Sequence, residues 1–127
     1  MTIYYDKVLP TGRYIENSAV KPDITIWNKT EHTALVIEVS VPSDYGINAA
    51  ERVKRNKYQP LMEDLRNSWK LRKIEIVPVI VGATGLVKKN LSELCDKIPG
   101  KPAVSELQIS ALLGSKTIIK RTLAQHI

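Results

Sequence analysis

The feature that most constrains the fold is IEIVPVIV, residues 74–81, an apolar segment with Glu75 as its one charged residue. A strand without polar alternation is typical of a strand that is covered on both faces. Helical patterns precede and follow this segment, so helices are available to cover it. We therefore expect a layered α/β fold in which residues 74–81 form a buried strand.

Two further strands are predicted at 23–28 and 34–41. Both segments are rich in β-branched and apolar residues, and Pro42 ends the second one. The polar residues between them suit a turn, so the two strands should pair as an antiparallel hairpin. The helix expected after them would cross over to residues 74–81.

That helix should run from about Ile47 to about Trp69, with Ser43 or Asp44 as its cap and Pro60 as a kink or break. A short helix is expected at 88–97 and a last one at 103–125, interrupted near Gly114. The predicted fold class is α/β: a small mixed sheet with a β-hairpin and then a βαβ crossover, flanked by helices.

The domain organisation follows from the length of 127 residues, which suits one domain. Residues 1–20 read as a lead-in, a loose hairpin or irregular segment around Pro10 to Gly12, and residues 21–127 as a single domain. The N-terminus lacks the apolar core of a signal peptide, and no segment is apolar enough to span a membrane. Cys95 is the one cysteine, which excludes an internal disulfide and fits a reducing compartment. The expected location is nuclear or intracellular.

The charge balance points to an acidic partner. The chain carries 19 Lys and Arg against 13 Asp and Glu, a net charge of +6, so nucleic acid is a candidate partner. A solvated surface remains the alternative explanation for each basic group. The groups are Lys54-Arg55-Lys57, Lys70-Arg72-Lys73, Lys88-Lys89 and Lys116-Lys120-Arg121.

Two carboxylates interrupt the predicted hairpin. Asp23 begins the first strand and Glu38 lies late in the second, so an antiparallel pairing brings them to the same end. Side chains alternate between the faces of a strand, and each strand has one apolar face and one face that carries its carboxylate. Two carboxylates that point together repel each other unless a cation lies between them, and hard oxygen ligands suit Mg²⁺ or Mn²⁺.

The helix at 47–69 directs a lysine at the same face. On a helical wheel the apolar arc is formed by Val53, Leu61, Met62, Leu65 and Trp69. Lys54 falls in the middle of this arc, with Lys57 and Tyr58 inside it. Because lysine is rarely buried without a partner, Lys54 should face the two acids.

Two acids and a lysine around a metal ion can cleave a phosphodiester. The metal would polarise the ester and lower the pKa of a bound water, and the lysine would position that water or stabilise the phosphorus charge. An ion-paired structural cluster, or exposed acids at strand ends, explains the same spacing without catalysis. Both readings stay open at this point.

The same residues carry a resemblance to a known family. Pro22-Asp23 followed by Glu38-Val39-Ser40 is similar to the PD-(D/E)XK nuclease signature. The chain more specifically resembles the restriction-like endonuclease domain at the C-terminus of non-LTR retrotransposon polyproteins. The resemblance covers most of Lys21 to Leu123 through an ordered set of stretches. They are KPDITIW, VIEVSVP, ERVKRNKYQPL, VPVIVGATG and LQISALLGSKTIIKRTL.

The resemblance implies a restriction-endonuclease-like fold and a Mg²⁺-dependent endonuclease that nicks DNA for target-primed reverse transcription. Mn²⁺ should substitute for Mg²⁺. It implies Asp23 and Glu38 as metal ligands, Lys54 as the catalytic lysine with Lys57 as second choice, and Tyr58 beside the site. Ser40 departs from the motif, which has lysine there, and Lys54 fits a lysine displaced to the helix.

The family also implies partners, namely DNA and the upstream reverse transcriptase and zinc-knuckle domains of a parent polyprotein, which this chain from Met1 lacks. The alternative is a degenerate remnant, a basic module that binds nucleic acid or another partner without catalysis.

Other candidate sites have simpler explanations. Cys95 should be a core thiol. The segment from Gly82 to Gly85 lacks the ending of a phosphate loop, so a turn is expected there, although its amides could lie near a DNA backbone. An apolar stripe near the C-terminus should pack under the sheet. Its members are Ile109, Leu112, Leu113, Ile118, Ile119 and Leu123.

Overall fold

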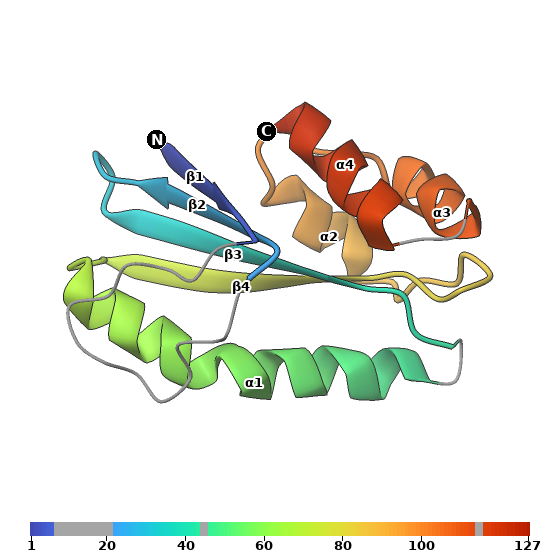
Figure 1. The fold of residues 1–127 in the computed structure, drawn as a ribbon, viewed down its shortest axis with the longest axis horizontal. Helices are drawn as coiled ribbons and strands as arrows, with labels where there is room; N and C mark the ends of the chain where they lie inside the picture. Colours follow the sequence, from blue (N-terminus) through green and yellow to red (C-terminus); the bar gives the residue numbers. More distant parts are fainter. Residues whose placement is uncertain (7–21, 44–45, 114–115) are drawn as a thin grey trace. The chain divides into compact units, whose positions relative to one another are not determined.

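The computed structural model describes residues 1–6, 22–43, 46–113 and 116–127. The protein is α/β, with a four-stranded mixed sheet flanked by helices (Figure 1). The strands lie in the order β1, β2, β3, β4, and the expected fold class is confirmed at this level. Their bounds are Thr2–Tyr5, Ile24–Asn28, Thr33–Ser40 and Lys73–Ile80.

Strands β2 and β3 form the predicted antiparallel hairpin, with Ile24 opposite Ile37 and Asn28 opposite Thr33. Strands β3 and β4 run parallel. Just before β3, the carbonyl of His32 accepts a hydrogen bond from the N–H of Arg72 at 2.7 Å. At the other end of β3, the carbonyl of Ser40 accepts a hydrogen bond from the N–H of Val81 at 3.1 Å. This arrangement is the βαβ crossover predicted from the sequence.

Strand β1 was not predicted. Residues Thr2–Tyr5 pair antiparallel with β2, and Tyr4 lies opposite Thr25. The sequence TIYY has the β-branched and aromatic residues that favour a strand. The turn expected around Pro10 to Gly12 lies outside the described residues.

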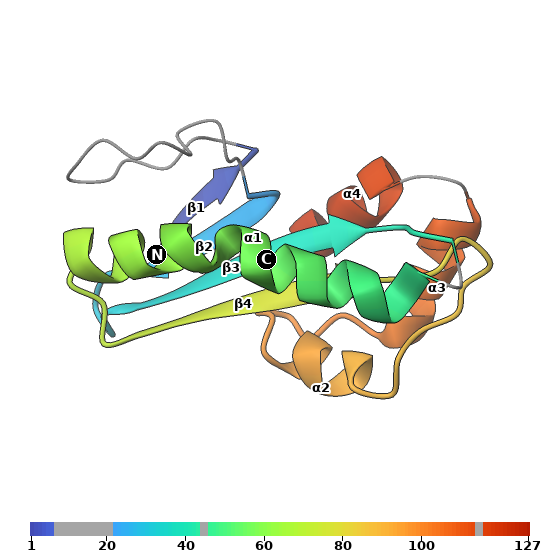
Figure 2. The same ribbon diagram turned by 90° about the horizontal axis from the view of Figure 1, so that it is seen from below.

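Helix α1 covers Ile47–Ser68 and continues through Pro60, so the expected break is absent. Tyr58, Leu61 and Leu65 are buried on either side of this proline, and their packing holds the helix where one backbone hydrogen bond is lost. Figure 2 shows α1 in front of the strands, which places it on one face of the sheet.

By the grouping of backbone contacts, the chain divides into two compact units. Unit 1 is Met1–Glu38 with Lys54–Val77, and unit 2 is Val39–Val53 with Pro78–Ile127. In unit 1 the second half of α1 packs on the sheet. The buried cluster is Ala34, Tyr58, Leu61, Leu65, Trp69, Leu71 and Ile76.

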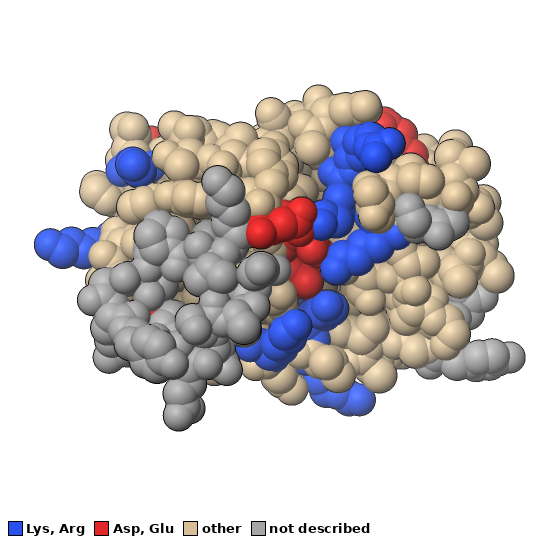
Figure 3. Space-filling view, viewed as in Figure 1, with Lys and Arg blue, Asp and Glu red and all other residues tan. Residues whose placement is uncertain are grey.

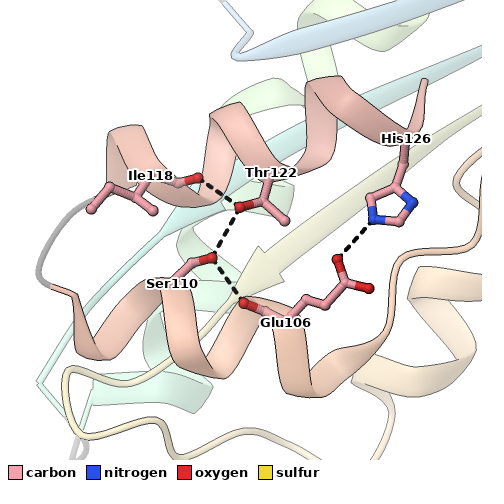
Figure 4. A network of polar contacts seen from close by, with 5 residues as sticks. All are labelled: Glu106, Ser110, Ile118, Thr122 and His126. Atoms are coloured by element: carbon pink, nitrogen blue, oxygen red, sulfur yellow. Dashed lines mark hydrogen bonds and ion pairs between the residues drawn. The ribbon is translucent and has the colours of Figure 1, made fainter.

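Unit 2 holds the helices α2 (Leu91–Asp96), α3 (Val104–Leu112) and α4 (Lys116–His126). Polar contacts join α3 to α4 (Figure 4): Ser110 Oγ lies 3.0 Å from Thr122 Oγ1, and His126 Nε2 lies 2.9 Å from Glu106 Oε2. Each hydroxyl also lies within hydrogen-bond distance of a carbonyl one turn earlier, Ser110 at 2.8 Å from Glu106 and Thr122 at 3.0 Å from Ile118. With one proton on each hydroxyl, two of these three contacts are hydrogen bonds at any moment.

The C-terminal stripe is buried only in part. Ile119 and Leu123 are fully buried, but Ile109, Leu112 and Leu113 on and after α3 are 59%, 62% and 68% exposed. The expectation that these three side chains pack under the sheet is therefore wrong. No helix among the described residues is long and apolar enough to cross a membrane.

Candidate functional site

The two predicted acids lie side by side at one end of the β2–β3 hairpin, in unit 1. Thr25 lies opposite Val36 in the β2–β3 register. Two residues further along, the same register places Asp23 opposite Glu38 on the same face, and we call this pair the acid row. The N–H of Asp23 donates to Glu38 Oε2 at 3.1 Å, which closes this row. Both residues are buried, with 4% and 2% of their surface exposed, and they lie at the same end of the hairpin, as expected from the sequence.

Helix α1 brings two more predicted residues to Glu38. Lys54 Nζ lies 3.2 Å from Glu38 Oε1, and 21% of the lysine side chain is exposed. The hydroxyl of Tyr58, one turn along α1, also hydrogen-bonds the Glu38 carboxylate. Glu38 therefore has a cation, a hydroxyl and a backbone amide around one buried carboxylate, which satisfies the rule that buried charges are paired.

The acids in turn act on Tyr58. Burial, and then the negative charges of Glu38 and Asp23, raise the pKa of Tyr58 well above its ordinary value of 10.0. The phenol therefore stays protonated over the whole physiological range and serves as a hydrogen-bond donor to Glu38 rather than as a proton acceptor.

Lys57 does not share the position of Lys54. It is exposed, and its ammonium lies 5.4 Å from the ring centroid of Tyr58. Val53 is 60% exposed as well, so the predicted apolar arc was too wide on this side. The face of α1 that meets the acids is defined by Lys54 and Tyr58. On the face seen in Figure 3, basic side chains lie next to a group of acidic ones.

The chemistry of the donor set fits a hard divalent cation, because Asp23 and Glu38 offer buried carboxylate oxygens from neighbouring strands. These two residues would hold the ion, with Lys54 and Tyr58 keeping Glu38 in place. The described part of the chain contains no group of three His, Cys, Asp or Glu side chains placed for a metal ion.

The sequence analysis gave no role to two residues beside the acids. The N–H of Asp6, just after β1, donates to the carbonyl of Asp23 at 3.1 Å, which brings a third acidic residue next to the pair. Thr25 is fully buried on the face of Asp23, and its hydroxyl has no hydrogen-bond partner among the described residues. Asp6 could be found only from the β1 pairing, which joins distant parts of the sequence.

The remaining sequence candidates are structural. In unit 2, the N–H of Gly82 donates to Leu86, that of Ala83 to Pro42, and that of Gly85 back to Gly82. These three amides already donate to backbone carbonyls of the protein, so they do not form a phosphate cradle. Cys95 is buried, as expected for a core thiol. Lys88 lies 2.6 Å from Glu51, and its charge is paired.

Comparison with known proteins adds no identification. No family model matches the chain, and no curated protein matches it in sequence. The residues and their geometry therefore carry the functional argument.

Proposed function

We propose that the protein is a metal-dependent DNA endonuclease with a restriction-endonuclease-like fold, related to the endonuclease domains of non-LTR retrotransposon polyproteins. One observation carries this proposal. The buried pair Asp23 and Glu38 occupies one cross-strand row, and Lys54 reaches the same row from α1. An acid pair with a lysine is the set expected at a metal-dependent phosphodiesterase site.

Each residue has a role in this proposal. Asp23 and Glu38 would hold a divalent ion, Mg²⁺ or Mn²⁺, which when bound would supply Lewis-acid stabilisation of the phosphate and a more acidic water. Lys54 provides positive charge where negative charge develops on phosphorus. Tyr58 keeps the Glu38 carboxylate oriented, because its protonated hydroxyl donates to that group. The net charge of +6 favours encounter with DNA.

The test is nicking of supercoiled plasmid by the purified chain with Mg²⁺. Asp23→Asn and Glu38→Gln should each lower the nicking rate by about 100-fold or more, since each removes an oxygen ligand with little change of shape. Glu63→Gln is the matched control, because Glu63 is an exposed carboxylate on α1 in the same unit. Lys54→Ala should abolish nicking while DNA affinity stays nearly unchanged.

A non-catalytic nucleic-acid-binding module is the second candidate, and a specific observation favours it. Glu38 already has three partners within the protein, as a structural ion pair would. The same experiment separates the two functions. If the wild type, Asp23→Asn and Glu38→Gln all nick plasmid equally, the acids do not catalyse the cleavage. The acids would then be structural, and the basic surface would serve to bind nucleic acid.

A further inference from the structure

The end of unit 1 opposite to the acid row holds a stack of aromatic side chains. The rings of Trp27 and Trp69 lie face to face, with 4.0 Å between centroids and 10° between planes. Tyr4 continues the group, 5.9 Å from Trp69. Trp69 is buried, but Trp27 on β2 is partly exposed. The stack therefore has an outer member that reaches the surface.

A lysine covers the outer face of Trp27. Lys29 Nζ lies 4.7 Å from the centroid of the Trp27 ring, and Trp69 occupies the opposite face at 4.0 Å. Lys29 is exposed and makes no ion pair with any described residue. In the turn, Asn28 Oδ1 accepts the N–H of Glu31 at 3.1 Å, which fixes the backbone from which Lys29 projects.

Further positive charge lies at this end. The N–H of Arg72 donates to the carbonyl of His32 at 2.7 Å, so the segment after α1 runs beside the β2–β3 turn (Figure 1). This segment adds Lys70 and Arg72, both exposed. The neighbouring acids do not cancel the charge: Glu31 is one exposed carboxylate, and Glu75 pairs with Lys73 at 2.8 Å.

From this placement we infer that Trp27 and Lys29, with Lys70 and Arg72, form a binding site for single-stranded nucleic acid. An unpaired base stacks on the outer face of Trp27, and the Lys29 ammonium moves from the ring to a phosphate. An aromatic platform among lysines and arginines is how proteins bind single strands without reading sequence. This site lies outside the acid row and goes beyond the proposed cleavage.

The exchange is favourable in magnitude. Contact of a lysine with an exposed aromatic ring is worth a factor of about 2 to 5 in an equilibrium constant. Stacking of a base on an aromatic side chain is worth a factor of about 5 to 150. The lysine also gains a phosphate partner when it leaves the ring. Trp27 follows Asp23, the residue just before β2, by four positions. At the rise of a strand this is about 13 Å, so the site is separate from the acids.

Tryptophan fluorescence tests this site directly, because Trp27 and Trp69 are the two tryptophans of the chain. The wild type is titrated with an oligothymidylate in metal-free buffer containing EDTA, where no cutting takes place. Fluorescence should be quenched to saturation. Lys29→Met should weaken binding by about 3-fold or more and flatten the salt dependence of log K by roughly 0.7, the loss of one phosphate contact.

Two further variants test for a general effect of charge and for the role of the aromatic ring. Lys101→Met removes one exposed positive charge in unit 2 and should leave quenching and affinity unchanged. Trp27→Leu should lower affinity by about 5-fold or more, and since it can also loosen the core, circular dichroism must show that it folds. Lys29 is exposed, so its variant tests the site without risk to the fold.

Three results would overturn the inference: no quenching, equal weakening in Lys29→Met and Lys101→Met, or equal quenching by a blunt duplex of the same length. Failure of the proposed nuclease activity is a separate outcome. The titration in EDTA involves neither metal nor cutting, so its result tests the inference whether or not the wild type nicks plasmid.

Discussion

At the residue scale, the chemistry of this protein centres on Glu38, a carboxylate with 2% exposure at the end of an apolar strand. Burial of a lone charge is costly, so each neighbour that donates to Glu38 also stabilises the fold. Lys54, Tyr58 and the Asp23 amide perform that task. A residue that serves the site here serves stability as well, and variants must be compared with controls that separate the two.

The contrast between Lys54 and Lys57 gives a direct prediction. Lys54→Met should lower the free energy of unfolding by about 1–3 kcal/mol, because Glu38 stays buried and loses its cation. Lys57→Met should change it by less than about 0.5 kcal/mol, since that side chain is exposed and rests on the ring of Tyr58. Urea denaturation measures both. Equal losses in the two variants would contradict the assignment of Lys54 as the partner of the buried acid.

At the element scale, what could be predicted depended on local pattern. Alternation identified the face that carries Asp23 and Glu38, and a short polar segment identified the hairpin turn. The pairing of β1 with β2 joins segments distant in sequence, and nothing in Thr2–Tyr5 states which strand it meets. A helical wheel likewise shows which residues share a face. It does not show whether that face finds a partner, which is why Val53 and Leu112 were misplaced.

The contact between the α2–α3 connection and the end of α4 depends on a glycine. Gly100 has φ +82°, and a Cβ built there would clash with the carbonyl oxygen of His126. Gly100→Ala should therefore lower the free energy of unfolding by more than about 2 kcal/mol, through left-handed backbone strain and displacement of α4. Thermal or urea denaturation checks the value.

Gly46→Ala is the matched control for that substitution. Its Cβ would lie 3.6 Å from the nearest atom, in Pro42, which is ordinary contact. With no positive φ at Gly46, alanine should be neutral or stabilise the protein by up to about 1 kcal/mol. Similar losses at the two positions would mean that the close approach of Gly100 to His126 does not hold in solution.

At the scale of the whole molecule, two buried groups make stability depend on alkaline pH. Burial, and then the charge of Asp96, raise the pKa of Cys95 from 9.0 to about 11. The pKa of Tyr58 is raised above 10.0. Both groups are neutral when protonated. From pH 9.0 to about 11 for Cys95, and above pH 10.0 for Tyr58, the unfolded chain has lost a proton that the folded chain keeps. The free energy of unfolding therefore falls as pH rises.

The two groups lie in different units, Tyr58 in unit 1 and Cys95 in unit 2, so together they test cooperativity. Because α1, β3 and β4 run through both units, we expect a single unfolding transition. Its midpoint should shift with the titration of both Cys95 and Tyr58. Urea denaturation from about pH 8 to about pH 11 measures it. Cys95→Ala should flatten the decline from pH 9.0 to about 11, and Tyr58→Phe the decline above pH 10.0. Two transitions, each sensitive to one of these substitutions, would instead show that the units unfold independently.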